Sequence, residues 1–248
     1  MDEKEFNELV DRTGRGRVFA QARRVALADC SPTGRMRLDA LARWLQDVAY
    51  EDVDDAGLAA VAVWVVRRTR MQVARFPRFG ERFTVQTFCS GIGAMWAERR
   101  TTITRFESRD ADVEAVSLWV HLEPVSRRPA PFSDAEVAVY AEAASERRIR
   151  ARLRHPPPGS AADSAQRMGT WGFRATECDI AGHVNNAAYW EPIEEELLGA
   201  PEPERLDAEM EYRTPSQPGE KLILGDGGRR WILNSEGEVH ASVLMVSG

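Results

Sequence analysis

The chain has 248 residues, of which 43% are hydrophobic and 29% are charged, so it can bury a sizeable core and is not wholly disordered. Its formal net charge of -6 argues against non-specific nucleic-acid binding, which depends on excess lysine and arginine. The longest apolar run, residues 57–66, is about half of a bilayer span, and the acidic start MDEKEFNEL is not a signal peptide. We therefore expect a soluble, cytoplasmic protein that binds neither nucleic acid nor membrane.

The first part of the chain predicts one long helix followed by strands. Leucine and valine recur on one face of residues 36–48, which indicates a helix. Alternating apolar residues over 82–88 and 113–122 predict strands, and the Gly-x-Gly of 90–96 is interpreted as a turn between strands. A capping serine opens a further helix at 133–143.

A linker then divides the chain. An arginine-rich run leads into RHPPPGSAADSAQ at 154–166, whose prolines, glycine and serines are typical of a linker. We predict an N-terminal domain at 1–150 and a C-terminal domain at 160–248, which ends in a strand at 238–246. One helix per run of antiparallel strands indicates the α+β class, with the helix covering one sheet face.

The two parts contain similar elements in the same order, which suggests an internal repeat. ADCSPTG at 28–34 corresponds to TECDIAG at 176–182, because the Cys and Gly coincide and an acidic residue precedes each Cys. Residues 70–87 similarly correspond to 209–226. Two such units could form a pseudo-dimer within a monomer, or the chain could pair again as a homodimer.

The stretch ECDIAGHVNN at 177–186 is the densest group of chemically capable side chains. One interpretation is purely structural: Asn185 or Asn186 caps a helix, and Gly182 makes the turn before it. The combination also suits acyl transfer, which needs a general base and donors to an oxyanion. Such a site needs no metal or cofactor.

Asp179 and His183 are the candidate catalytic residues within this stretch. Asp179 could take a proton from water or attack directly, and His183 could hold the water, the substrate oxygen or the carboxylate. In the first part, Ser31 stands in place of Asp179 and Arg35 in place of His183. The N-terminal copy is therefore expected to lack the chemistry.

The motif D-x-x-G-H-V-N-N-x-x-Y at 179–189 resembles the signature of hot-dog thioesterases. FGERFTVQTFCSGIGAMWAERR at 79–100 resembles the acyl-ACP thioesterases of plants and bacteria, and the resemblance extends from about Phe19 to the C-terminus. It implies two tandem hot-dog domains, each an antiparallel sheet wrapped on a central helix. It also implies hydrolysis of fatty acyl-ACP to free fatty acid and acyl carrier protein, with the second domain catalytic and the first cradling the acyl chain.

Two places differ from the family pattern. Ala181 stands where the family usually has Asn, and Pro215 and Ser216 stand where it has a carboxylate and a Cys. The spacing E-C-D-I-A-G also resembles the D-C-D-P-A-G of 4-hydroxybenzoyl-CoA thioesterase-type enzymes, which rely on one Asp and a helix N-terminus. This second resemblance favours the simpler mechanism, with Asp179 as base or nucleophile.

In that mechanism the backbone amides of Gly182 to Val184 hold the carbonyl oxygen. Asn185 or Asn186 orients the substrate or caps the helix. Two other functions stay open: an acyl-CoA thioesterase, and a non-catalytic acyl-binding or carrier-binding protein whose site has decayed.

Other motifs carry less specific expectations. Arg67 to Arg70 and the linker arginines are interpreted as solvent-exposed faces. The alternative, functional interpretation is that they dock an acidic carrier protein. Arg35 could alternatively bind a phosphate of the carrier's pantetheine. The three cysteines are expected to be free thiols, and no metal-ligand spacing occurs. Four residues are candidates for the wall of an acyl cavity: Trp44, Trp64, Met95 and Trp96.

Overall fold

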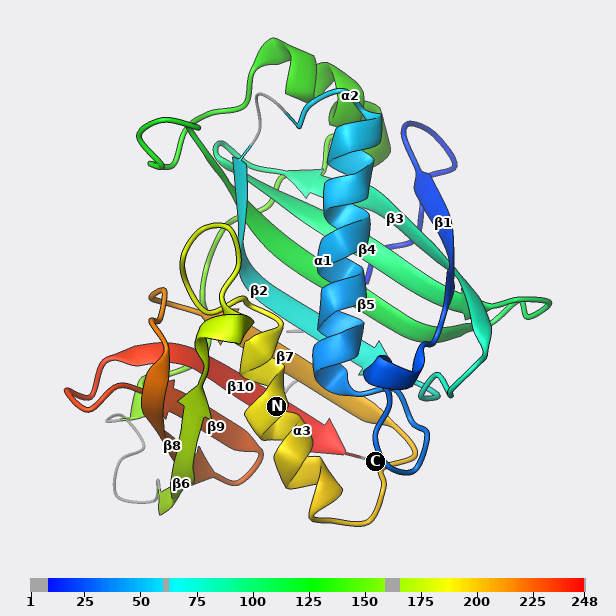
Figure 1. Cartoon of the computed structure of the whole chain (residues 1–248). Coiled ribbons are helices and arrows are strands. Elements are labelled where there is room, and N and C mark those ends of the chain that lie inside the picture. Colours follow the sequence, from blue (N-terminus) through cyan, green and yellow to red (C-terminus); the bar gives the residue numbers. More distant parts are fainter. Residues whose placement is uncertain (1–8, 60–62, 159–165, 248) are drawn as a thin grey trace.

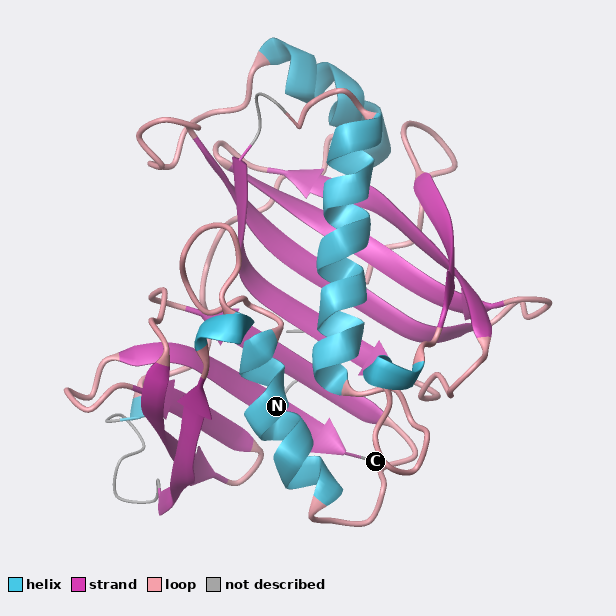
Figure 2. Ribbon diagram, viewed as in Figure 1, coloured by secondary structure: helices cyan, strands magenta, loops and turns pink. Residues whose placement is uncertain are grey.

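The computed structural model describes residues 9–59, 63–158 and 166–247. The strands in these ranges form one antiparallel sheet in the order β1-β3-β4-β5-β2-β7-β10-β9-β8-β6 (Figures 1 and 2). The first five are β1 (Phe19–Arg24), β2 (Val63–Val73), β3 (Arg82–Ile92), β4 (Trp96–Arg105) and β5 (Ala111–Leu122). The others are β6 (Gln166–Phe173), β7 (Leu206–Tyr212), β8 (Gly219–Asp226), β9 (Arg229–Leu233) and β10 (Val239–Ser247).

A long helix, α1 (Leu38–Asp55), lies across the sheet formed by the first five strands (Figure 1). The side that was expected to face the core is buried, with Leu38, Leu41 and Val48 each 0% exposed. Each such side chain contributes about 1.5–3 kcal/mol of stability relative to exposure. The helix extends past the expected end at residue 48 because Ala49 and Val53 continue the buried side.

Two shorter helices complete the framework. α2 (Asp134–Ala144) packs against β3, and its Ser133 cap closes a capping box with Glu136, as the sequence predicts. α3 (Glu191–Leu198) lies over the second part of the sheet and contacts α1 (Figure 1). None of the helices in the described residues is both long and apolar enough to cross a membrane.

The two parts of the chain are joined where β2 pairs with β7, from Arg68 opposite Glu211 to Val73 opposite Leu206. Arg70 Nη2 lies 2.5 Å from Asp207 Oδ2, and Arg68 Nε lies 3.7 Å from Glu209 Oε2. Arg68 and Arg70 are only 2% and 3% exposed, so reading them as a solvated face was wrong. Their positive charges compensate the acidic side chains that β7 brings into the sheet.

The start of the predicted linker is packed against the second part of the sheet. His155 is buried, and the Trp231 indole N–H donates to the Pro156 carbonyl over 2.9 Å. The rest of the linker, 159–165, lies outside the described residues. The division into domains at 1–150 and 160–248 stays a prediction, since the sheet runs through both parts.

Candidate active site

The same backbone turn occurs once in each part of the chain. In the first, the Ser31 N–H donates to the Arg35 carbonyl over 2.7 Å, and in the second the Asp179 N–H donates to the His183 carbonyl over 3.0 Å. Gly34 and Gly182 occupy the same place with φ of 81° and 78°, a left-handed conformation that favours glycine. The repeat seen in the sequence is therefore present in the backbone hydrogen bonds.

The Asp179 carboxylate is held by two hydrogen bonds. One oxygen accepts the Ala181 N–H at 2.8 Å, and the other accepts the Asn185 side-chain amide at 3.1 Å. The Asn185 side-chain oxygen in turn accepts the Ala187 N–H at 2.8 Å, just before the helical turn at Ala188–Trp190; the N-cap of that turn is Ala187, so the expected side-chain cap by Asn185 or Asn186 is not formed there. Because one side chain makes both contacts, the carboxylate is oriented by the start of the helical segment.

His183 closes the turn opposite Asp179. The two residues are joined through the backbone, and the His183 side chain is half-buried. Among the described residues, the His183 imidazole forms no hydrogen bond, either to Asp179 or elsewhere. The structure thus brings both candidate residues into one turn and leaves the imidazole available to a substrate.

Two of the three backbone amides expected to hold the carbonyl oxygen, those of Gly182 and Val184, are already used by the fold. The Gly182 N–H donates to the Asp179 carbonyl at 2.9 Å, and the Val184 N–H donates to the Ser216 carbonyl at 2.9 Å. For these two amides the mechanism needs correction, because an engaged N–H is not free for an oxyanion, whereas the His183 N–H forms no hydrogen bond with the described residues. The Asn186 N–H forms no hydrogen bond with the described residues, and Asn186 lines a hollow beside the turn.

The corresponding turn in the first part is closed by a buried ion pair. Arg35 is 1% exposed, and its two terminal nitrogens lie 2.5 and 3.2 Å from the Glu194 carboxylate oxygens of α3. Glu194 also accepts the Leu38 N–H at 2.9 Å, and the guanidinium lies over the Phe76 ring. Arg35 is therefore a structural contact between the parts, which rules out phosphate binding by Arg35 in this conformation.

The places where the family has a carboxylate and a Cys lie beside the Asp179 turn. Ser216 is 1% exposed, its carbonyl accepts the Val184 N–H, and its hydroxyl donates to the Gln217 carbonyl at 3.0 Å. The Gln217 side-chain amide donates to the Gly182 carbonyl at 3.2 Å. These contacts stabilise the turn and supply neither a carboxylate nor a thiol.

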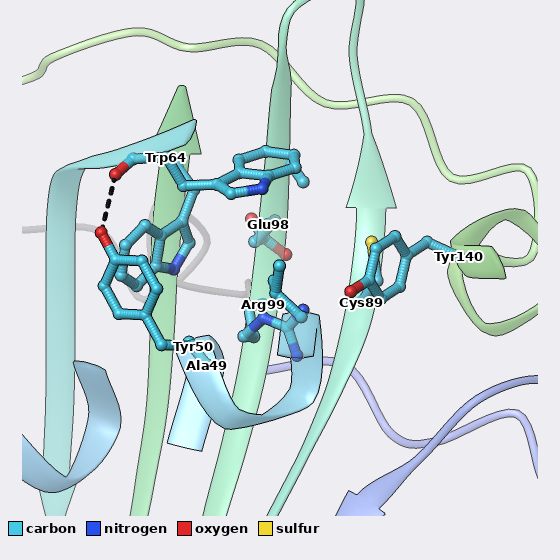
Figure 3. A pocket seen from close by; sticks show the side chains of 10 residues that line it. Ala49, Tyr50, Trp64, Cys89, Glu98, Arg99 and Tyr140 are labelled. Carbon is cyan, nitrogen blue, oxygen red and sulfur yellow. Dashed lines mark hydrogen bonds between the residues drawn. The ribbon is translucent and has the colours of Figure 1, made fainter. Parts of the chain in front are cut away.

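A hollow of about 390 Å³ lies between α1, α2 and strands β2 to β5 (Figure 3). Its wall includes Tyr50, whose ring centroid is 6.0 Å from that of Trp119. Burial raises the pKa of Tyr50, and the negative charge of Asp179 raises that pKa further, so Tyr50 lies within electrostatic reach of the turn. Trp119 also lines a second hollow of about 230 Å³ beside Asn186.

Of the residues proposed for the cavity wall, Trp64 lines the larger hollow. Trp44 instead packs on Phe83, and the Trp96 indole donates to the Ile149 carbonyl. Sequence reasoning missed Trp119 as a wall residue, although it alternates with Ser117 and His121 on the strand. Tyr140 was also missed, and its place in the capped helix α2 gave no signal of a cavity.

The cysteines are free, as expected. Burial raises the pKa of Cys89 to about 11, so its thiol is protonated near neutral pH and is a poor nucleophile. Cys178 precedes Asp179 in the turn, pairs with Val184 through the backbone and donates its N–H to the Ala175 carbonyl at 3.2 Å.

His155 lies close to Glu209 and Glu211 of β7, and the three have the donor types of a metal site. Their charges are already compensated, because Arg68 lies 3.7 Å from Glu209 and Arg213 lies 3.4 Å from Glu211. The Glu211 carboxylate also accepts the backbone N–H groups of residues 154 and 155. This arrangement fits an ion-pair network that fastens the linker, and we assign it no metal.

The chain is similar in fold to several solved structures. An acyl-ACP thioesterase from Bacteroides thetaiotaomicron is 20% identical, covering 93% of this chain and 98% of that chain with a TM-score of 0.76. The 12:0-ACP thioesterase from Umbellularia californica is 17% identical, covering 94% and 99% with a TM-score of 0.70. These similarities confirm the α+β class, and they define the chain as a protein of the hot-dog fold.

Residues 16–140 match the family model of the acyl-ACP thioesterase N-terminal domain, and the chain belongs to the acyl-ACP thioesterase family. It is therefore a thioester hydrolase. An uncharacterized protein of Mycobacterium tuberculosis is 28% identical over 220 residues, or 87% of this chain and 85% of the relative. The chloroplastic oleoyl-acyl carrier protein thioesterase of Coriandrum sativum is 28% identical over 172 residues, which cover 62% of this chain but 44% of that protein.

Proposed function

We propose that this protein hydrolyses fatty acyl-ACP to free fatty acid and acyl carrier protein, with Asp179 activating the water. The observation that carries the proposal is the contrast between the two equivalent turns. One holds an Asp179 carboxylate by two hydrogen bonds beside an unengaged His183 side chain, while Ser31 and Arg35 occupy the same places in the other. Only the second turn has a group able to take a proton from water.

The reaction needs two proton transfers, both through Asp179, and no cofactor. Asp179 accepts a proton from water as the water oxygen attacks the thioester carbonyl carbon. The carbonyl oxygen becomes negative and is met by the Asn186 N–H, while His183 positions the water or that oxygen. The C–S bond then breaks, and the proton held by Asp179 passes to the departing sulfur. A general base typically contributes about 10²–10⁴ in rate, and an oxyanion donor about 10²–10³.

Asn185 acts in this scheme as a positioning residue. Its side-chain amide holds one Asp179 oxygen, which fixes the direction of the carboxylate and leaves the lone pairs on its other side for water. Its side-chain oxygen is fixed in turn by the Ala187 N–H. Loss of this contact is expected to lower kcat while leaving the KM nearly unchanged.

The partners follow from the same proposal. The acyl chain enters the hollow between α1 and β2 to β5, so the N-terminal part holds the substrate and the C-terminal part acts on it. The family resemblance and the plant relatives favour acyl carrier protein over coenzyme A as the carrier. A cytoplasmic location, and a monomeric or homodimeric state, stay expectations from the sequence.

The experiment is a thiol-release assay on acyl-ACP thioesters of several chain lengths. We expect Asp179→Ala to lower kcat at least 100-fold, in line with loss of a general base. Ser31→Ala is the matched control, because it changes the equivalent residue of the other turn and should leave the rate unchanged. Circular dichroism checks that both variants fold, and undiminished hydrolysis by Asp179→Ala would refute the mechanism.

The same assay separates the alternatives. A clear preference for acyl-CoA over acyl-ACP of equal chain length would refute the carrier assignment. Tight binding of acyl-ACP with no turnover at any length would instead select a carrier-binding or acyl-binding role.

A further inference from the structure

The larger hollow contains hydrogen-bond donors that the fold does not use. Among the described Trp and Tyr side chains, four have a buried polar atom without a hydrogen-bond partner. Three of the four line this one hollow: Trp64, Trp119 and Tyr140. These side chains are 8%, 6% and 5% exposed, so water outside the protein does not solvate them freely.

The three donors are spread along the hollow. Its floor crosses the neighbouring strands β2, β5, β4 and β3, which span three strand spacings, or about 14 Å. Trp64 and Trp119 lie at the end near Tyr50, since the Tyr50 hydroxyl donates to the Trp64 carbonyl at 3.1 Å. Figure 3 shows Tyr140 across the hollow beside Cys89, with Arg99 between the two groups.

The charged groups in the same wall are already paired. Arg99 donates to Asp52 at 2.6 Å, and Glu98 accepts from Ser90 at 2.8 Å and from Arg147. They therefore leave no net charge to attract an ionic ligand. The unpaired groups are neutral donors on a mostly apolar wall, which complements a neutral oxygen acceptor.

A plain alkyl chain matches the apolar part of this wall but leaves its donors unpaired. Leaving a buried donor unpaired costs about 1–3 kcal/mol, and a hydrocarbon offers it no acceptor. Burial raises the pKa of Tyr140 to about 12, so its hydroxyl keeps its hydrogen near neutral pH. A site with donors of this kind discriminates against an analogue that lacks the matching oxygen.

We propose that this hollow selects acyl chains that carry an oxygen, as hydroxy-acyl or oxo-acyl thioesters, through the indole N–H groups of Trp64 and Trp119 and the Tyr140 hydroxyl. The inference rests on the proposed function, because it names the substrate class of that same site. An oxygen near the thioester would meet the two indoles, and one farther along the chain would meet Tyr140.

The test uses dodecanoyl-ACP and its derivatives with a hydroxyl or ketone at successive carbons. We expect kcat/KM for at least one oxygenated derivative to exceed that for dodecanoyl-ACP by about tenfold or more. Tyr140→Phe, Trp64→Phe and Trp119→Phe each remove one donor, and at least one should abolish the preference. Trp171→Phe is the matched control, because it removes an unpaired indole N–H that does not line this hollow.

A binding measurement separates this inference from the proposed hydrolysis. Calorimetry compares dodecanoic acid with the oxygenated acid of best fit, using wild-type protein and the phenylalanine variants. Tighter binding of the oxygenated acid that a donor deletion removes supports the inference even if no thioester is cleaved. Equal binding and equal rates for both series, or a preference that survives all three deletions, would overturn it while leaving acyl-ACP hydrolysis untouched.

Discussion

Glu194→Gln tests the ion pair of Arg35 with Glu194, which lies at the first turn, where Arg35 stands in the place of His183. The substitution keeps the shape of the side chain and an oxygen that can accept the Leu38 N–H. It removes the negative charge facing Arg35, whose nitrogens lie 2.5 and 3.2 Å from the carboxylate oxygens. Because Arg35 is 1% exposed, its charge would be left buried with only the Glu202 carboxylate, 4.0 Å from its Nε, as a counter-ion.

Breaking a buried ion pair by removing one partner typically costs about 3–5 kcal/mol. The retained bond to Leu38 and the contact of Arg35 with Phe76 favour the lower end, about 3 kcal/mol. A double change, Arg35→Met with Glu194→Gln, removes both charges, keeps an acceptor for the Leu38 N–H and should recover most of that loss. We therefore expect a large loss of unfolding free energy in the single variant and a small loss in the double variant.

Urea unfolding followed by tryptophan fluorescence measures these free energies. The control is Glu51→Gln, which removes a carboxylate 2.6 Å from Arg23 at the surface, where the side-chain exposures are 16% and 36%. That variant should lose less than about 1 kcal/mol. Equal losses for Glu194→Gln and Glu51→Gln, or a double variant worse than Glu194→Gln, would refute the reasoning.

Two further predictions concern stability. The pKa of Glu191 is raised to about 7 by burial and then by the charges of Glu177 and Asp39, so its ionised form destabilises the fold at higher pH. With allowance for solvent screening, we expect Glu191→Gln to raise the unfolding free energy by about 1 kcal/mol at pH 8 and by almost nothing at pH 4, where both states are protonated. Urea unfolding at the two pH values measures this, and a benefit that is independent of pH would contradict it. Ser133→Ala removes the cap of α2 and should cost about 1 kcal/mol in the same assay, whereas an unchanged midpoint would mean that the capping box contributes nothing.

Contacts formed within one short segment could be predicted from the sequence. The Ser133 cap and the glycine turns each depend on residues within a few positions of one another. The correspondence of Ser31 with Asp179 also followed from spacing alone, and the backbone hydrogen bonds repeat it. Such features are predictable because the partner atoms are supplied by the same short segment.

Contacts between segments far apart in the chain could not be predicted from the sequence. Arg70 looks like a surface residue until β7 places Asp207 beside it, 137 positions later in the chain. Arg35 similarly finds Glu194 from another helix. The sequence could not show which backbone amides of the turn are free, because the acceptor of the Val184 N–H is the carbonyl of residue 216. Trp119 and Tyr140 share a wall only because α2 returns over β3.

The pairing of β2 with β7 makes a homodimer-like assembly from one covalent chain. In a true homodimer, symmetry forces every substitution to appear in both copies of a turn. Fusion removes that constraint, so an arginine that serves as an anchor at residue 35 need not be accepted at residue 183. Each molecule should accordingly turn over substrate at one place, and an active-site titrant should react once per chain rather than twice.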